Sequence, residues 1–195
     1  FDDYSTYKFV FHDEQSAGLT FKPETVEVTV GGTKLNPADY TVETNLTDGC
    51  TFHVVINDLK KISSATANAD VVVAYKSTLN NHAVIGSAGN PNEAYLGYSN
   101  NPHNSNDTTT TPKDKVTVFT FKVVANKING ANDKPLKGAA FALYKKGKDS
   151  AWKLVGLSNA TETKGNYTIE DPDQTTFNWV GLDDGEYKIV EIITP

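Results

Sequence analysis

The sequence has one cysteine, no methionine, no long apolar run and no excess of basic residues. Cys50 cannot form a disulfide within the chain, so a covalent cross-link would have to come from other residues. No apolar stretch approaches the roughly 20 residues of a membrane-spanning helix. The net charge of -6, without a basic patch, makes nucleic acid an unsuitable partner. Without an initiating methionine, we expect the chain to be a piece of a larger protein.

What the sequence does contain is a series of short alternating segments, separated by turn signals every ten residues or so. This pattern is typical of β-sandwiches, and no segment predicts a helix longer than two turns. A hairpin is expected where residues 25–30 and 33–35 flank Gly31-Gly32. Further strands are expected at residues 7–13, 19–21, 40–43, 51–56, 70–76, 116–128, 139–145, 152–155, 167–169, 176–182 and 187–193.

The segment at residues 103–115, HNSNDTTTTPKDK, is polar and of low complexity. We expect it to be unstructured and to mark a domain boundary near Pro112. At 195 residues the chain is suited to two small domains. We therefore predict an all-β chain with domains at residues 1–112 and 113–195.

Two expected strands place an acid on their apolar face. Asp13 follows aromatic residues at alternate positions, and Glu191 lies between Ile189 and Ile193 on one face of the last strand. Glu191 could belong to an edge strand or pair with a basic residue, and Asp13 could cap the turn at residues 16–18. The alternative is a carboxyl group kept protonated by burial and used in chemistry.

Sequence motifs give both regions a family resemblance. In the second region, residues 127–129 read KIN, residues 135–143 read PLKGAAFAL and residues 181–195 read GLDDGEYKIVEIITP. These resemble the motifs of Cna-B-type domains of Gram-positive surface proteins, including the E-box of pilins. In the first region, the FHD, GLTF, NPN and YSNNP segments between residues 11 and 102 resemble the preceding domain of pilus shaft subunits. The resemblance is to backbone pilins, and it implies two tandem immunoglobulin-like β-sandwiches.

The same resemblance implies intramolecular isopeptide bonds between lysine and asparagine side chains. Lys127 matches the amine donor of the second domain, and Glu191 matches its catalytic acid. Asn92 matches the acceptor of the first domain, and Asp13 matches its acid. The third partner of each set is expected outside this sequence. The reaction would run once, so we do not expect an enzyme with turnover.

The residues themselves leave alternatives open for these assignments. Asn92 could be one more turn asparagine, and Lys127 could be a solvated strand lysine. Lys122 is a rival donor on the same strand but lies outside the matched motif. Asn178 is a weak rival acceptor. The histidines at positions 12, 53, 82 and 103 show no ligand spacing, so neither a metal site nor a cofactor is predicted.

The function implied by the resemblance is structural. Sortase would join such subunits to other pilins in a covalent shaft on the cell wall, so the expected location is extracellular. The alternative is an adhesin or minor pilin that binds a host protein or glycan. Its candidate contacts are the loop at residues 103–112 and exposed aromatic side chains such as Trp152. A β-sandwich hydrolase is less suitable, since no catalytic pair is apparent outside the two expected cores.

Overall fold

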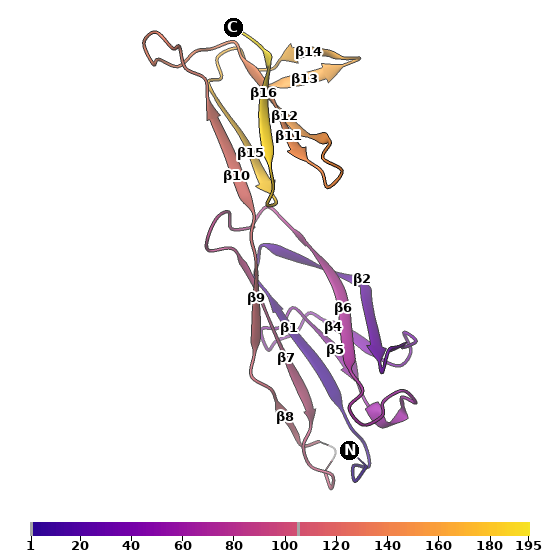
Figure 1. Ribbon diagram of the computed structural model, residues 1–195. Coiled ribbons are helices and arrows are strands. Elements are labelled where there is room, and N and C mark those ends of the chain that lie inside the picture. The colour runs from indigo at the N-terminus through magenta and orange to yellow at the C-terminus, as the bar shows by residue number, and fades with distance from the viewer. Residues whose placement is uncertain (1, 105) are drawn as a thin grey trace. The chain divides into compact units, whose positions relative to one another are not determined.

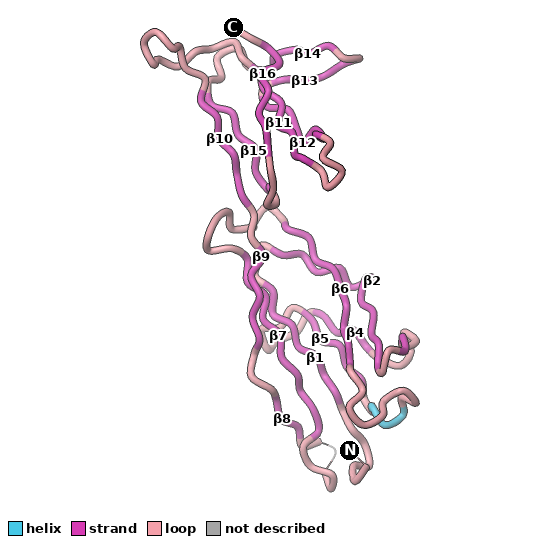
Figure 2. The backbone as a smooth tube through the Cα atoms, viewed as in Figure 1, coloured by secondary structure: helices cyan, strands magenta, loops and turns pink. Residues whose placement is uncertain are grey.

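The computed structural model describes residues 2–104 and 106–195 and is built of strands and connecting loops (Figures 1 and 2). The all-β prediction is confirmed. The described chain forms two compact units, the first comprising residues up to 84 together with 89–118, and the second comprising residues 85–88 and 119–195. None of the helical segments in the described residues has the length and apolar character needed to cross a bilayer.

Unit 1 contains two facing sheets. The larger has the strand order β4-β5-β1-β7-β8, with β9 also paired to β7, and the smaller has the order β3-β2-β6. The strand bounds of the larger sheet are β1 (Phe9–Gln15), β4 (Thr41–Thr44), β5 (Phe52–Ile56), β7 (Asn90–Ser99), β8 (Thr108–Thr110) and β9 (Asp114–Val118). Those of the smaller sheet are β2 (Leu19–Val30), β3 (Thr33–Lys34) and β6 (Val71–Leu79).

The core of unit 1 lies between these sheets because alternate residues of each strand point inward. Val28 and Val30 of β2 pack in one cluster with Phe52 and Val54 of β5, and all four side chains are fully buried. On β6, by contrast, Val72 points outward and is 51% exposed. The period-two pattern of the sequence therefore corresponds to burial in this unit.

The predicted glycine hairpin is confirmed. Thr33 pairs with Val30, and the two-residue turn at Gly31 and Gly32 has φ values of 56° and 76°. Positive φ at both central positions is what a type I′ turn requires, and glycine adopts it without steric cost. A short helical turn follows β5 as η1 (Leu59–Lys61), which Asp58 caps by accepting a hydrogen bond from the Lys60 N–H.

A bulge interrupts the pairing of β2 with β6. The register shifts between Lys22 and Glu27, so that several residues of β2 lie opposite Tyr75 of β6. Pro23 falls within this irregular stretch, where its missing N–H removes no ladder hydrogen bond. Thr25 bridges the gap, since its hydroxyl donates to Lys22 O at 2.6 Å and accepts from Lys76 N at 2.9 Å.

Unit 2 is built around a second apolar cluster. Two sheets, β10-β15 and β12-β11-β16, contribute to it, and a separate hairpin is formed by β13 and β14. Phe141 and Leu143 of β11 pack against Phe177 and Trp179 of β15 in this cluster. The strand bounds are β10 (Phe121–Asn126), β11 (Ala140–Lys146), β12 (Trp152–Ser158), β13 (Ala160–Thr163), β14 (Asn166–Ile169), β15 (Thr176–Leu182) and β16 (Tyr187–Ile193).

The prediction that residues 103–115 are unstructured is wrong in part. Thr108–Thr110 form β8 and Asp114 begins β9, and both strands pair with β7, whereas Ser105 lies outside the described residues. Both strands are held by backbone pairing to β7. β8 consists of three threonines, so it has no hydrophobic pattern that would predict a strand, and only the end of β9 falls within the strand expected from residue 116. As a result residues 113–118 lie in unit 1, beyond the boundary expected after residue 112.

The same substitution is expected to affect stability differently on the buried and the exposed face of the β2-β6 pair. Val28→Ala removes fully buried methyl groups from the core, and we expect it to lower the free energy of unfolding by about 2 kcal/mol. Val72→Ala is the matched control on the solvent face, and we expect an effect within about 0.5 kcal/mol. Urea denaturation measures both. Equal losses for the two variants would contradict the burial described here.

Candidate functional site

The Asp13 carboxyl group is the charged side chain most deeply placed in unit 1. Asp13 lies on β1, a strand paired on both sides, opposite Phe52 of β5 and Ala94 of β7. Its side chain is fully buried. Phe52 stacks on Phe21 at 3.8 Å between ring centroids and lies 4.9 Å from the Tyr75 ring. The carboxyl group therefore sits at the border of an aromatic cluster, where isolated charge is costly.

Asn92 and Tyr75 satisfy one oxygen of this carboxyl group. The Tyr75 hydroxyl donates to Asp13 Oδ2 at 2.5 Å, and Asn92 Nδ2 donates to the same oxygen at 2.9 Å. Asn92 Nδ2 also lies 3.0 Å from the Tyr75 hydroxyl oxygen, which closes a triangle of polar groups. Asp13 Oδ1 and Asn92 Oδ1 are buried and have no hydrogen-bond partner within the described residues. The site therefore retains two buried acceptors that a further donor can satisfy.

The structure rejects two alternatives for these residues. Asn92 lies within β7 and not in a turn. The turn at residues 16–18 is closed by the Leu19 N–H, which donates to Ser16 O, whereas the Asp13 carboxylate contacts Asn92 and Tyr75. Asp13 and Asn92, predicted from different segments of the sequence, are thus brought into direct contact.

Tyr75 is the member of this site that sequence reasoning missed. Burial raises the pKa of Tyr75, and its hydrogen bond to the Asp13 carboxylate raises that pKa further, so the hydroxyl stays protonated and donates. Its position in the alternating pattern of the strand could have identified it from the sequence. Tyr75 follows Val71 and Val73 at alternate positions of β6, which places it on the core face.

An open pocket gives access to the triangle from outside the core. Its volume is about 430 Å³, and its wall includes Asn92 and Tyr75 themselves. Leu79 of β6 and Val116 and Val118 of β9 also line it, and each is more than a third exposed. An apolar wall beside a buried polar group is suited to an extended segment with one long polar side chain.

In unit 2, Lys127 and Glu191 form the corresponding pair. Lys127 Nζ lies 2.8 Å from Glu191 Oε1 and donates a hydrogen bond to Oε2 at 2.9 Å. The backbone of Lys127 is fixed on both sides, because its N–H donates to Thr175 O and its carbonyl accepts from Leu136 N, each at 2.9 Å. Both side chains of the pair are about one-quarter exposed. This geometry also fits the simpler interpretation of Glu191 as an acid paired with a basic residue.

The rival residues of unit 2 point away from its core. Lys122 of β10 is exposed, and so is Asn178 of β15, whose neighbours Phe177 and Trp179 are buried. Strand alternation explains both placements. Lys127 is therefore the lysine of this region that contacts the E-box acid.

Comparison with known proteins gives matches for both units. Residues 2–102 match the family model described as "Gram-positive pilin backbone subunit 2, Cna-B-like domain". Residues 121–195 match the model of the SpaA "prealbumin-like fold domain". The first match covers more than half of the chain, and the two matches fall on the two structural units.

Streptococcal pilins are among the similar proteins. The "Trypsin-resistant surface T6 protein" of Streptococcus pyogenes serotype M6 is 26% identical over 205 residues, covering 94% of this chain and 34% of that protein. The solved T6 backbone pilin has a TM-score of 0.66 at 23% identity, covering 98% of this chain and 40% of the other. A C-terminal fragment of the major pilin GBS80 of Streptococcus agalactiae has a TM-score of 0.67 at 22% identity. This match covers 99% of the present chain and 75% of that fragment.

The chain spans about a third of the length of its curated relative. Its fold is that of major pilin subunits, and the family match extends over most of unit 1. The chain belongs to the family of Gram-positive pilin backbone subunits.

Proposed function

We propose that this chain is part of the shaft subunit of a covalent surface pilus, with domains strengthened by self-catalysed lysine–asparagine isopeptide bonds. Family membership supports the role in a pilus backbone, with other pilin subunits as partners and the cell surface as location. The observation that carries the isopeptide proposal is the direct contact between the buried Asp13 carboxyl group and the Asn92 carboxamide. Joining of subunits by sortase and anchoring to the cell wall belong to the same proposal.

The chemistry proposed for unit 1 is an aminolysis of the Asn92 side chain. A neutral lysine amine attacks the carboxamide carbon, a new C–N bond forms, and the original C–N bond breaks to release ammonia. Asp13 in its protonated form hydrogen-bonds the carboxamide, passes its proton to the leaving nitrogen, and takes up the proton that the attacking amine loses. Tyr75 donates to the same carboxyl oxygen and fixes its orientation. Folding supplies the proximity that makes an otherwise slow reaction accessible.

In unit 2 the proposed donor and acid are already in contact. A proton that moves from Lys127 Nζ to Glu191 across their 2.8 Å contact converts an ion pair into a neutral amine and a protonated acid. A single proton transfer therefore produces both the nucleophilic amine and the protonated acid, and the net charge of the pair does not change. The proposal assigns the carboxamide that Lys127 would attack to a further strand, because Asn178 of β15 is exposed.

Such cross-links suit a subunit that must withstand tension. By analogy with a disulfide, a bond between distant strands is worth roughly 2–5 kcal/mol against unfolding. It replaces the disulfides that a chain with one cysteine cannot form internally. It also restrains local opening, on which proteolysis depends.

The adhesin alternative receives no support from its candidate aromatic residue. The Trp152 ring packs beneath two lysine side chains, with Lys188 Nζ 4.7 Å and Lys146 Nζ 5.8 Å from its centroid. These cation–π contacts occupy the ring within unit 2. Trp152 therefore gives no support to a host-binding role.

We expect a chain extended at both ends to be lighter than its sequence mass by one ammonia for each bond formed. Asp13→Asn and Glu191→Gln should each abolish one of these losses, because the acid that activates the carboxamide is removed. Intact mass spectrometry gives the result. Glu14→Gln is the matched control, since Glu14 is the next residue of β1 and pairs with Lys113 on the opposite face. An extended wild-type chain at full sequence mass would overturn the isopeptide proposal.

We expect Tyr75→Phe to slow formation of the unit 1 bond without preventing it. The variant loses a hydrogen bond to the Asp13 carboxyl group, worth about 0.5–1.5 kcal/mol for a neutral acceptor, which corresponds to roughly two- to tenfold in rate if the bond is lost in the transition state. The mass of freshly folded extended chain, followed over time, measures that rate. Tyr40→Phe is the control, because the Tyr40 hydroxyl donates to Val26 O away from the site. Equal rates for both variants would exclude a role for Tyr75.

A further inference from the structure

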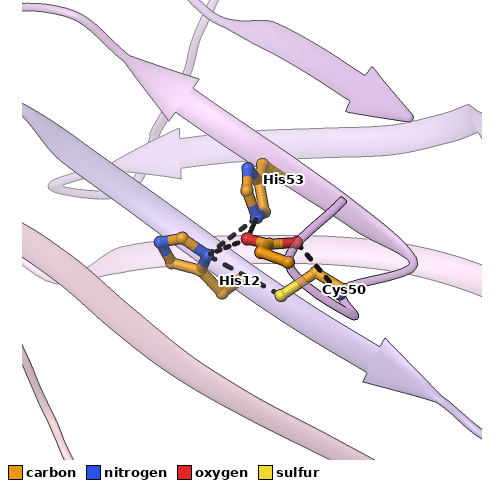
Figure 3. Close-up of side chains that lie close together, drawn as sticks. His12, Cys50 and His53 are labelled. Carbon is orange, nitrogen blue, oxygen red and sulfur yellow. Dashed lines mark hydrogen bonds and ion pairs between the residues drawn. The ribbon is translucent and has the colours of Figure 1, made fainter. Parts of the chain in front are cut away.

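Four potential metal ligands converge on the outer face of the larger sheet of unit 1. His12 lies on β1 between two inward-pointing residues, so its ring is on the face opposite the core. His53 of β5 is its direct cross-strand partner. Asp48 and Cys50 lie in the loop between β4 and β5. Figure 3 shows the side chains of His12, Cys50 and His53 pointing toward one another.

We propose that His12, Asp48, Cys50 and His53 form a site for one divalent transition-metal ion, with zinc as the expected occupant. One ligand atom from each of the four residues lies within 4.8 Å of the others, a grouping found among the described residues. The cluster is separate from the Asp13 site, which lies on the opposite face of the same strand.

The distances are close to those of a tetrahedral site. His12 Nδ1 and His53 Nε2 are 2.8 Å apart, and Cys50 Sγ lies 3.8 Å from His12 Nδ1. Asp48 Oδ2 lies 2.9 Å from His53 Nε2 and 3.9 Å from His12 Nδ1. In a tetrahedral zinc site, ligand nitrogens lie about 3.3 Å apart, and a nitrogen and a sulfur lie about 3.6 Å apart. Zinc would therefore need the two rings to separate by about half an ångström.

The donor set selects the class of metal. Two imidazoles, a thiol and a carboxylate are the groups that bind zinc and its neighbours, whereas calcium and magnesium prefer oxygen ligands alone. His12 and His53 keep only 16% and 12% of their side-chain surface exposed, so the rings are held within the sheet surface. Asp48 is 40% exposed and leaves the cluster open to an ion from solvent.

Neighbouring groups orient the ligands as an outer shell does in metal sites. Glu43 Oε2 lies 3.6 Å from His53 Nδ1, the ring nitrogen that faces away from His12. A carboxylate at this position fixes the ring and the tautomer of a metal-binding histidine. On the other side, the Tyr95 ring stacks on His12 at 4.4 Å with an angle of 6° between the planes. The strand register places four side chains in one row across β4, β5, β1 and β7, and these are Glu43, His53, His12 and Tyr95.

The loop conformation directs Asp48 and Cys50 toward the rings. Gly49 between them has φ of 92°, a value that glycine adopts readily and other residues avoid. The Cys50 N–H donates to Asp48 Oδ1 at 3.0 Å, which leaves Oδ2 directed at the histidines. A surface pocket of about 360 Å³, lined by both histidines, Glu43 and Tyr95, adjoins the cluster.

Titration of the metal-free chain with Zn²⁺ tests the proposal. We expect one zinc ion per chain by calorimetry, and with Co²⁺ we expect the near-ultraviolet charge-transfer absorption of a thiolate–cobalt bond. His53→Ala should abolish stoichiometric binding, and Cys50→Ser should abolish the cobalt absorption. His82→Ala is the control, because His82 is exposed in the loop after β6. Circular dichroism verifies the fold of each variant.

Either of two results would overturn the proposal. One is a wild-type chain that takes up no zinc, which would leave the cluster as a set of mutual hydrogen bonds. The other is His53→Ala and His82→Ala binding zinc equally, which would place the ion elsewhere. Cys50→Ser keeps the size of the side chain, so loss of the cobalt absorption in a folded variant reports the thiolate and not a collapsed loop.

A separate variant tests the outer shell. We expect Glu43→Gln to weaken zinc binding about 10- to 100-fold, because the carboxylate no longer supports the His53 ring. Glu24→Gln, at an exposed position of β2, is the charge-matched control and should bind as the wild type does. Unchanged zinc affinity in Glu43→Gln would show that Glu43 does not support the His53 ring. The assignment of the four ligands would then depend on the titrations of the wild type, His53→Ala and Cys50→Ser.

Discussion

Burial of the Asp13 carboxyl group is the constraint on which the architecture of unit 1 depends. A charge in this position is costly unless neighbouring groups bind it. The structure meets this requirement with Tyr75 from the smaller sheet and Asn92 from the adjacent strand of the larger sheet. The contact joins both layers of the sandwich. Asp13 Oδ1 and Asn92 Oδ1 are left without a hydrogen-bond partner among the described residues, which is an arrangement suited to a further donor and to chemistry.

The central strand β1 carries two different sets of polar residues because a strand presents alternate side chains to opposite faces. Phe9 and Asp13 face the core, where the proposed covalent bond forms. His12 faces outward, where it meets His53, Asp48 and Cys50. One seven-residue segment thus contributes to both the proposed cross-link and the proposed metal site.

Much of the fold and of the candidate site was predictable from local sequence pattern. Alternation identified most strands, and motifs identified Asp13, Asn92, Lys127 and Glu191. What local pattern could not give is cross-strand register. Tyr75 joins the site through the packing of two sheets, and the row from Glu43 to Tyr95 exists only once β4, β5, β1 and β7 are aligned. Histidines 41 positions apart have no ligand spacing in the sequence, yet they lie opposite each other.

Peptide mapping of an extended chain by tandem mass spectrometry tests the central claim most directly, since it identifies the residue that reacts. We expect a branched proteolytic peptide in which the Asn92 side chain is joined by an amide bond to a lysine of a preceding strand. Recovery of the peptide containing Asn92 in linear, unmodified form from the folded, extended chain would contradict the claim.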